Sequence, residues 1–295
     1  MQLRKIILKR LEWLGHLFFY TVLRLGGQGA GYFFLYPVVF CYVICSPKIH
    51  RITQPYFSRR FPQHGWWRRR LHVYRNVLAF GRTLVDRAWI GLSRSRVISG
   101  RFEDGDRFQE IIARGRGVVV LLAHVGNWQS SFADLERLPV AIHALMEYDT
   151  RAVAKHFFDL GKKRSFTIID VNGFMGGMVE ATVALQRGEV VLIMGDRLAG
   201  GPSAVVSFLG SPLRLPLAPY RLAASTGAPL VVLFSAKTGR RHYRLFIADV
   251  LRCSGCERPS REQLVCHASR FAGALEHYVR EYPYQWYNFF NIWQQ

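Results

Sequence analysis

The stretch Val118-Val119-Val120-Leu121-Leu122-Ala123-His124-Val125-Gly126-Asn127 decides the fold that we expect for this chain. Its first five residues are apolar and mostly β-branched, which predicts a buried strand. Gly126 supplies a turn, and Asn127 is a residue type that caps the N-terminus of a helix. A strand that turns directly into a helix is the repeating step of an α/β fold, in which active groups lie at the carboxyl ends of the strands. His124 therefore stands where an α/β enzyme would have a base.

Downstream of His124, runs typical of strands alternate with runs typical of helices. This alternation predicts an α/β domain with a mostly parallel sheet flanked by helices, and we expect the domain to occupy residues 61–295. Its predicted strands and helices are 71–93, 118–122, 128–137, 140–146, 164–171, 176–186, 190–194, 205–209, 218–226 and 229–234, with an edge strand at 243–250 and a closing helix at 263–282.

The N-terminal part of the chain is both basic and apolar. Residues 1–75 contain thirteen Lys and Arg against one acid, Glu12, and so carry +12 of the formal net charge of +20. Residues 11–25 and 32–45 are largely apolar, but the second run is short of the ~20 residues that span a bilayer comfortably. Basic residues flank the two runs, which favours the cytoplasmic side for both ends. We expect residues 1–60 to be a membrane-association segment, a hairpin or a pair of interfacial helices that turns near residues 26–31.

Two other arrangements of this segment stay open on the sequence alone, namely two buried core helices and a single spanning helix. A removed signal peptide is not expected, because no cleavage pattern of small residues follows the apolar runs. Positive charge beside apolar runs favours anionic membrane lipids as partners, and it argues against nucleic acid, which requires a polar face with stacking aromatics.

The cysteines do not predict a disulfide framework or a metal site. There are five of them, an odd number in a chain without a secretory signal. Cys253, Cys256, Cys266 and His267 are potential zinc ligands, but their irregular spacing is more typical of a surface turn with small thiols. We expect no metal and no bound cofactor.

Three further motifs follow His124 along the chain. The predicted strand 190–194 runs into Gly195-Asp196-Arg197, which brings an acid and a permanent cation to the edge of the sheet. Phe208-Leu209-Gly210 comes next, and the chain closes with Gln285-Trp286-Tyr287-Asn288. None of these motifs is specific by itself, since an Asp-Arg pair at a strand end is more often a structural ion pair than a site.

In this order and spacing, together with the His124-x-Gly-Asn-Trp block, the motifs resemble the bacterial lysophospholipid acyltransferase-like superfamily, in the branch that includes the lipid A biosynthesis acyltransferases. The resemblance covers most of the chain. It implies an acyltransferase on the cytoplasmic face of the inner membrane. The acyl donor would be a thioester of acyl carrier protein or coenzyme A, and the acceptor a hydroxyl or amine of a lipid, such as a lysolipid or a lipid A-type glycolipid.

The resemblance also implies roles for individual residues. His124 would take the acceptor's proton as a general base, which is worth typically about 10²–10⁴-fold in rate. Backbone N–H groups near Gly126, or the guanidinium of Arg197, would stabilise the oxyanion. Asn127, Trp128, Arg197, Phe208 and Gly210 are the expected substrate-binding residues.

The sequence departs from the family pattern at Gln129. In the family, four residues separate the His from an Asp or Glu, which orients the imidazole and stabilises the imidazolium. An amide oxygen accepts a hydrogen bond but carries no charge. We therefore expect the catalytic set His124, Gln129 and Asp196, with Asp196 or the nearby Asp134 and Glu136 as sources of negative charge. The alternative is a catalytically degenerate homologue that binds membranes or lipids.

Overall fold

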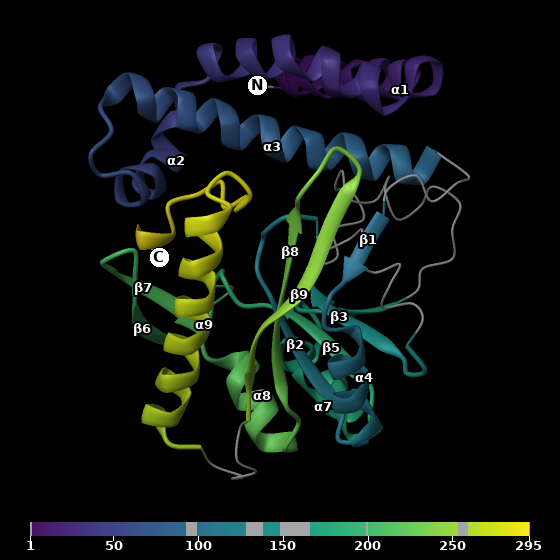
Figure 1. Ribbon diagram of the computed structural model, residues 1–295, viewed down its shortest axis with the longest axis vertical. Coiled ribbons are helices and arrows are strands. Elements are labelled where there is room, and N and C mark those ends of the chain that lie inside the picture. The colour runs from purple at the N-terminus through teal and green to yellow at the C-terminus, as the bar shows by residue number, and fades with distance from the viewer. Residues whose placement is uncertain are drawn as a thin grey trace.

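The structure is a computed structural model that describes residues 2–92, 99–127, 138–147, 166–198, 200–252 and 259–294. Its centre is a seven-stranded sheet in the order β1-β9-β8-β2-β5-β3-β4 (Figure 1). The strands are β1 (Ser99–Phe102), β2 (Val118–Leu122), β3 (Ile142–Met146), β4 (Thr167–Asp170), β5 (Val190–Met194), β8 (Leu230–Lys237) and β9 (His242–Leu251). Neighbours pair in parallel except β8 and β9, which are antiparallel. The predicted mostly parallel sheet is confirmed.

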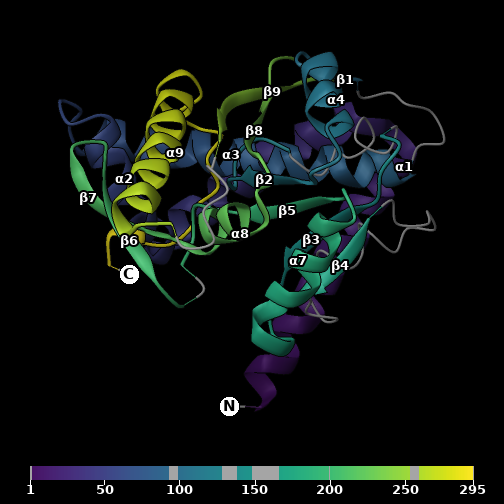
Figure 2. The same ribbon diagram turned by 90° about the horizontal axis from the view of Figure 1, so that it is seen from below.

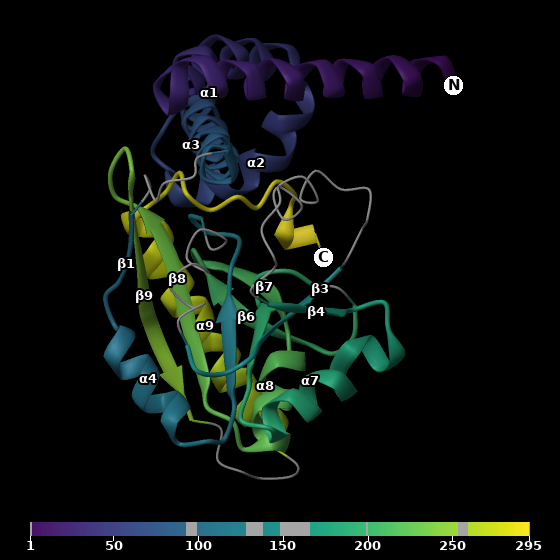
Figure 3. The ribbon, with the colours of Figure 1, turned by 90° about the vertical axis from the view of Figure 1, so that its right-hand side faces the viewer.

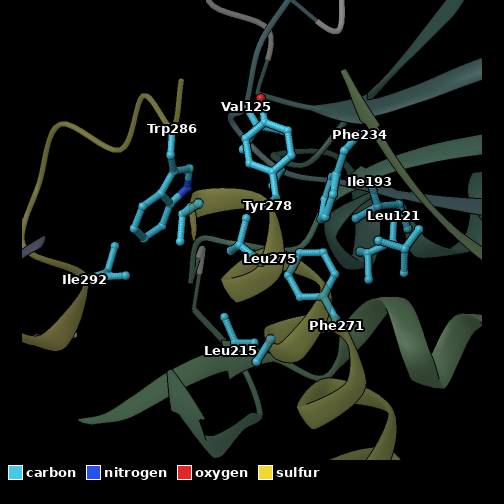
Figure 4. Packing of buried hydrophobic residues seen from close by; sticks show 14 of the residues in the cluster. Leu121, Val125, Ile193, Leu215, Phe234, Phe271, Leu275, Tyr278, Trp286 and Ile292 are labelled. Atoms are coloured by element: carbon cyan, nitrogen blue, oxygen red, sulfur yellow. The ribbon is translucent and has the colours of Figure 1, made fainter. Parts of the chain in front are cut away.

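Helices cover both faces of the sheet (Figures 1 and 2). Each face of the sheet has its own hydrophobic core. Successive residues of β2 belong to one core and then to the other, because successive side chains of a strand point to opposite faces. One core contains apolar residues of α4 (Gly105–Ala113), and the other contains residues of α7 (Met178–Gln186), α8 (Ala218–Thr226) and α9 (Arg261–Glu281). Figure 4 shows the second core, in which Phe271 and Tyr278 of α9 lie near Phe234 of β8. A short 3-10 turn, η1 (Phe174–Gly177), precedes α7.

Two predicted strands have different neighbours from those expected. The strand at 243–250 is not the edge, because β9 lies between β8 and β1, which is itself the edge strand. The strand at 205–209 is β6 (Ser203–Phe208), which pairs with β7 (Ser211–Pro216) as a separate antiparallel hairpin. Burial alternates along β6, as is typical of an antiparallel strand with one solvated face, whereas β2 is buried at every position.

The first 92 residues form a helical layer over one end of the sheet (Figures 1 and 3). It consists of α1 (Gln2–Cys45), α2 (Pro47–Arg60) and α3 (Trp66–Leu92). The helix α1 is broken at Gly27, whose φ of 66° is outside the helical range. Phe18 and Phe34 meet across the break with ring centroids 5.3 Å apart, so the two halves fold back on each other. The break lies inside the predicted turn at 26–31. The predicted boundary at residue 60 coincides with the end of α2, but α2 packs against α3, and the division into two domains stays a prediction.

A buried network joins this layer to the sheet. Asp86 of α3 is fully buried and forms an ion pair with Lys237 at the carboxyl end of β8, with Nζ 2.6 Å from Oδ2. Tyr243 of β9 donates to the same oxygen, and Gln28 and Tyr32 of α1 donate to the other, each at 2.6 Å. Since a buried charge is stable only when it is paired and hydrogen-bonded, this network fixes the layer against the carboxyl ends of the strands.

Candidate active site

His124 and Asp196 lie side by side beyond the carboxyl ends of two neighbouring strands. β2 and β5 pair in parallel, with Leu122 opposite Met194, so the residues two positions further on come together. His124 Nδ1 lies 2.8 Å from Asp196 Oδ1, and the His124 backbone N–H donates to Asp196 Oδ2 at 3.0 Å. The sequence prediction that both residues belong to one site agrees with this geometry, and the contact is direct.

The Asp196 carboxylate is buried and anionic. Its residue is 2% exposed, and the indole N–H of Trp286 donates to Oδ2 at 3.0 Å. Burial alone raises the pKa of a carboxyl, but the charge and hydrogen bonds of His124 and the positive charge of Arg197 lower the pKa of Asp196 to about 2. An ionised carboxylate only accepts hydrogen bonds, so the proton of the imidazole lies on Nδ1 and the lone pair on Nε2.

The His124 side chain is one quarter exposed, and its Nε2 has no hydrogen bond to any described residue. This is the state that a general base requires, in which one nitrogen is oriented by an acid and the other is available to a proton donor. Trp128 and Gln129, the predicted substrate-binding and catalytic neighbours, lie outside the described residues, as do Asp134 and Glu136.

The C-terminal segment (residues 282–290) supports the loop that carries His124. Val125 forms an antiparallel bridge with Trp286, and Tyr287 N–H donates to the His124 carbonyl at 2.7 Å. Gly126 N–H donates to the Gln285 carbonyl at 2.9 Å. Gly126 has a φ of +55°, and a Cβ there would lie 1.9 Å from the Ser235 carbonyl oxygen. Only glycine fits at this turn, since a side chain would meet both the strain of positive φ and the backbone of β8.

Helix α3 holds the same segment from the other side. The buried Asn76 donates to the carbonyls of Tyr284 and Trp286 at 3.0 and 3.1 Å. Nearer the His124 loop, Arg87 donates to the side-chain oxygen of Asn127 at 3.2 Å. Asn127, a predicted substrate-binding residue, is fully buried, and its described contacts are structural.

The three remaining predicted residues have different positions relative to His124. Arg197 donates from Nη2 to the Tyr287 carbonyl at 3.2 Å, and its guanidinium lies 4.9 Å from the centre of the Phe290 ring. Burial lowers the pKa of Arg197, and the charge of Asp196 opposes that shift. Phe208 is fully buried, with its ring centroid 5.4 Å from that of Trp286. Gly210, with a φ of +71°, lies in the turn between β6 and β7. Substrate binding by these residues stays a prediction.

The N–H of Gly126 itself donates to the Gln285 carbonyl, and the expectation that backbone N–H groups near Gly126 stabilise an oxyanion stays a prediction. The N–H of Val125 is also engaged, at 2.7 Å from the Ala123 carbonyl. Oxyanion stabilisation by the guanidinium of Arg197 also stays a prediction. His143 of β3 is paired with an acid, with Nε2 2.7 Å from Glu189 Oε2.

Neither metal nor disulfide chemistry is visible in the parts that the structure describes. No group of three or more His, Cys, Asp or Glu side chains is arranged there to hold a metal ion. Cys41, Cys45 and Cys266 are free thiols, and Cys253 and Cys256 lie outside the described residues.

Sequence reasoning missed the role of Trp286 and the supports of the C-terminal segment. Trp286 was visible only as part of the closing aromatic string, and nothing local in that string indicates a bond to Asp196, ninety residues away in the chain. Asn76 looks like an ordinary polar residue of an amphipathic helix. The aromatic residues that follow the last helix were the one indication in the sequence, since a run of apolar side chains is expected to pack against another part of the protein.

Comparison with known proteins bears on this arrangement. The family model for the bacterial lipid A biosynthesis acyltransferases matches residues 51–295. Phosphatidylinositol mannoside acyltransferases of two Mycobacterium tuberculosis strains are 28% identical over 138 residues, which are 46% of this chain and 42% of theirs. The match therefore spans less than half the length of these curated relatives.

Among solved structures, the 1-acyl-sn-glycerophosphate acyltransferase PlsC from Thermotoga maritima aligns with 88% of this chain and 99% of its own, at a TM-score of 0.40 and 13% identity. The family match includes both strand ends of the site, the β6–β7 hairpin and the C-terminal segment, and it extends over most of the chain. The protein belongs to the bacterial lipid A biosynthesis acyltransferase family.

Proposed function

We propose that this protein transfers a fatty acyl chain from a thioester to a hydroxyl or amine of a lipid acceptor, with His124 as the general base and Asp196 as its orienting acid. The contact between His124 Nδ1 and the buried Asp196 carboxylate, at 2.8 Å, is the observation that carries the proposal. It supports an active enzyme over a degenerate homologue, because the charge absent at Gln129 is present at Asp196.

The proposed reaction needs no covalent enzyme intermediate. Nε2 of His124 accepts the proton of the acceptor hydroxyl as its oxygen attacks the thioester carbonyl. The new C–O bond forms, the C–S bond breaks, and the imidazolium returns the proton to the departing thiolate. The anionic Asp196 stabilises the imidazolium during this step, and Arg197 is the proposed donor to the oxyanion.

The donor is proposed to be a thioester of acyl carrier protein or coenzyme A, and the acceptor a lysolipid or a lipid A-type glycolipid. The basic N-terminal helices favour acidic partners, which include anionic lipids and acyl carrier protein.

The proposed location is the cytoplasmic face of the inner membrane. Leu14–Cys45 is long and apolar enough to cross a membrane, and 28% of an apolar 18-residue window within it is buried. The break at Gly27 interrupts this stretch, so a hairpin or interfacial pair fits better than one straight spanning helix. The largely exposed apolar surface argues against two core helices.

His124→Ala tests the proposal. We expect transfer from acyl thioester to lipid acceptor to fall by about 10²–10⁴-fold, because the proton acceptor is lost. The assay is acyl transfer to extracted membrane lipids followed by mass spectrometry, with far-ultraviolet circular dichroism to verify folding. His277→Ala, on an exposed part of α9, is the matched control. A folded His124→Ala protein with full transfer would exclude His124 as the base, and a wild-type protein that binds lipid but consumes no thioester would favour the degenerate alternative.

A further inference from the structure

A cavity of about 730 Å³ lies behind the proposed active site, between the helical layer, the β8–β9 turn and the C-terminal segment. Gln285 and Tyr287 line it, whereas Trp286 between them points to Asp196. Neighbouring residues of an extended segment point to opposite sides, so the cavity and His124 lie on opposite faces of the same segment. The cavity is therefore separate from the space beside His124 Nε2.

Of the four cations that line the cavity, three have no acidic partner among the described residues. Arg75, Arg82 and Arg240 line it and have no ion pair within the described part of the chain. The buried Nε of Arg82 also has no hydrogen-bond partner among those residues. Lys237 is neutralised by Asp86, and the single lining acid, Glu281, lies 3.6 Å from Arg244. The charge that remains is positive.

Guanidinium groups of this kind favour phosphate. Arginine presents several N–H donors in a planar fork that matches the oxygens of a phosphate group. The Tyr284 hydroxyl, which lies 3.3 Å from Arg75, adds a neutral hydrogen-bonding group to the same wall. Such an arrangement is typical of a site for a phosphate ester, and nothing in the proposed acyl transfer uses it.

The cavity reaches the surface that is proposed to contact the membrane. Arg82 Nη2 donates to the hydroxyl of Tyr36 at 2.5 Å, and Tyr36 belongs to the apolar face of α1. Phe33 and Phe40, three residues before it and four after it, are 69% and 57% exposed. Because these positions share one face of the helix, a phospholipid whose chains lie against Phe33 and Phe40 has its headgroup at the level of Arg82.

We infer that this cavity is a second lipid site, which binds the phosphate headgroup of an anionic phospholipid. The site orients the protein on the bilayer and is distinct from the acceptor position at His124. The inference rests on the membrane association proposed above, but not on the role of His124.

The test compares two triple variants. Arg75→Gln, Arg82→Gln and Arg240→Gln together remove the charge of the cavity and keep most of the side-chain volume. Arg114→Gln, Arg116→Gln and Arg187→Gln remove the same charge from exposed positions beyond the amino ends of the strands.

Binding to phosphatidylcholine vesicles with and without phosphatidylglycerol is measured by sedimentation. We expect the cavity variant to lose at least about tenfold in affinity for the anionic vesicles, and the control to stay near the wild type. If the triple variant does not fold, Arg240→Gln alone, in an exposed turn, replaces it in the test. We expect this single variant also to bind the anionic vesicles more weakly than the wild type.

A second measurement, made in solution without vesicles, distinguishes binding of the lipid from binding of free phosphate and from membrane association in general. Calorimetry with monomeric short-chain phosphatidylglycerol and with inorganic phosphate should show tight binding of the lipid only, lost in the cavity variant. If both triple variants bind anionic vesicles equally, or inorganic phosphate binds as tightly as the lipid, the inference is overturned. If the wild type ignores vesicles but binds the short-chain lipid through the cavity, the headgroup site stands, whereas its orienting role and the proposed membrane association both fail. His124→Ala should bind lipid like the wild type.

Discussion

At the level of single residues, the position of the charge explains how this protein differs from the family pattern. Gln129 stands where the family has an acid next to His124 in sequence, whereas Asp196 supplies a carboxylate from the neighbouring strand. For the imidazole, an anion at Nδ1 is what matters, and not the position in the sequence from which it comes. Asp196 is also better desolvated than a surface acid, which strengthens its interaction with the imidazolium.

Asp196→Asn should therefore be far more harmful than Gln129→Ala. An amide at 196 removes the charge and allows the wrong His124 tautomer, and in the serine-protease template this exchange costs about 10⁴ in turnover. We expect kcat to fall by about 10²–10⁴-fold in Asp196→Asn and by less than about tenfold in Gln129→Ala. Steady-state kinetics with one acyl thioester measure both. A larger loss of kcat in Gln129→Ala than in Asp196→Asn would show that Gln129, and not Asp196, orients the His124 imidazole.

Asp196 also makes stability dependent on pH. Its pKa is about 2 in the folded protein and 3.8 ordinarily, so folding favours the ionised form. The stabilisation, on the order of 2 kcal/mol, is present above about pH 4 and is lost as the pH falls toward 2. In urea unfolding, the free energy of unfolding should fall less between neutral and acidic pH in Asp196→Asn than in the wild type. Asp106→Asn, at an exposed position of α4, should lose as much free energy of unfolding at acidic pH as the wild type. The same pH dependence in all three proteins would contradict the assignment of this effect to Asp196.

The sequence was sufficient to predict His124 and Asp196, because both end apolar strands whose carboxyl ends meet in any parallel sheet. It was not sufficient for Trp286 and Asn76. Their contacts depend on where a C-terminal segment crosses the sheet edge, and that crossing is determined by tertiary packing and not by local propensity. The same limit explains β6, whose strand propensity was recognised but whose partner was not.

Among the secondary-structure elements, α3 and the C-terminal segment act together on the site. The segment forms an isolated bridge to Val125, and its carbonyls at 284 and 286 are satisfied by the amide of Asn76. Helix α3 thereby supports the backbone at Trp286, whose indole N–H donates to the Asp196 carboxylate. A helix that lies outside the sheet is in this way part of the support of the proposed base.

Asn76→Ala should reduce both stability and activity. It leaves two largely buried carbonyls without their donor, which costs about 1–3 kcal/mol. We expect a lower unfolding midpoint in urea and a lower kcat with little change in KM, because Trp286 no longer holds Asp196 firmly. Asn172→Ala, an exposed asparagine, is the control and should change neither. A loss of stability with wild-type kcat under folding conditions would show that the segment does not position the site.

For the molecule as a whole, the arrangement of layers connects the membrane to the chemistry. The helical layer lies over the carboxyl ends of the strands, which is also the edge where His124 and Asp196 lie (Figure 3). One face of the second half of α1 is buried, with Leu35, Val39 and Val43 in the core. The opposite face is apolar and exposed, so the same helix has a protein side and a side available to lipid.

Replacing exposed aromatics of that second face should release the protein from membranes without damaging the site. Each buried phenylalanine contributes about 1.5–3 kcal/mol to transfer from water, so Phe33→Ser with Phe40→Ser should weaken binding to neutral vesicles by at least about 100-fold. The fold should persist, because both rings are mostly exposed in the protein. Activity on a soluble short-chain acceptor should be retained while activity on vesicle-embedded acceptor falls. Phe174→Ser with Met175→Ser, an exposed apolar pair in the η1 turn far along the chain from α1, is the matched control. If the control variant loses vesicle binding and the α1 variant keeps it, the membrane side of the molecule lies at η1, and the orientation that brings the His124 edge toward the bilayer is wrong.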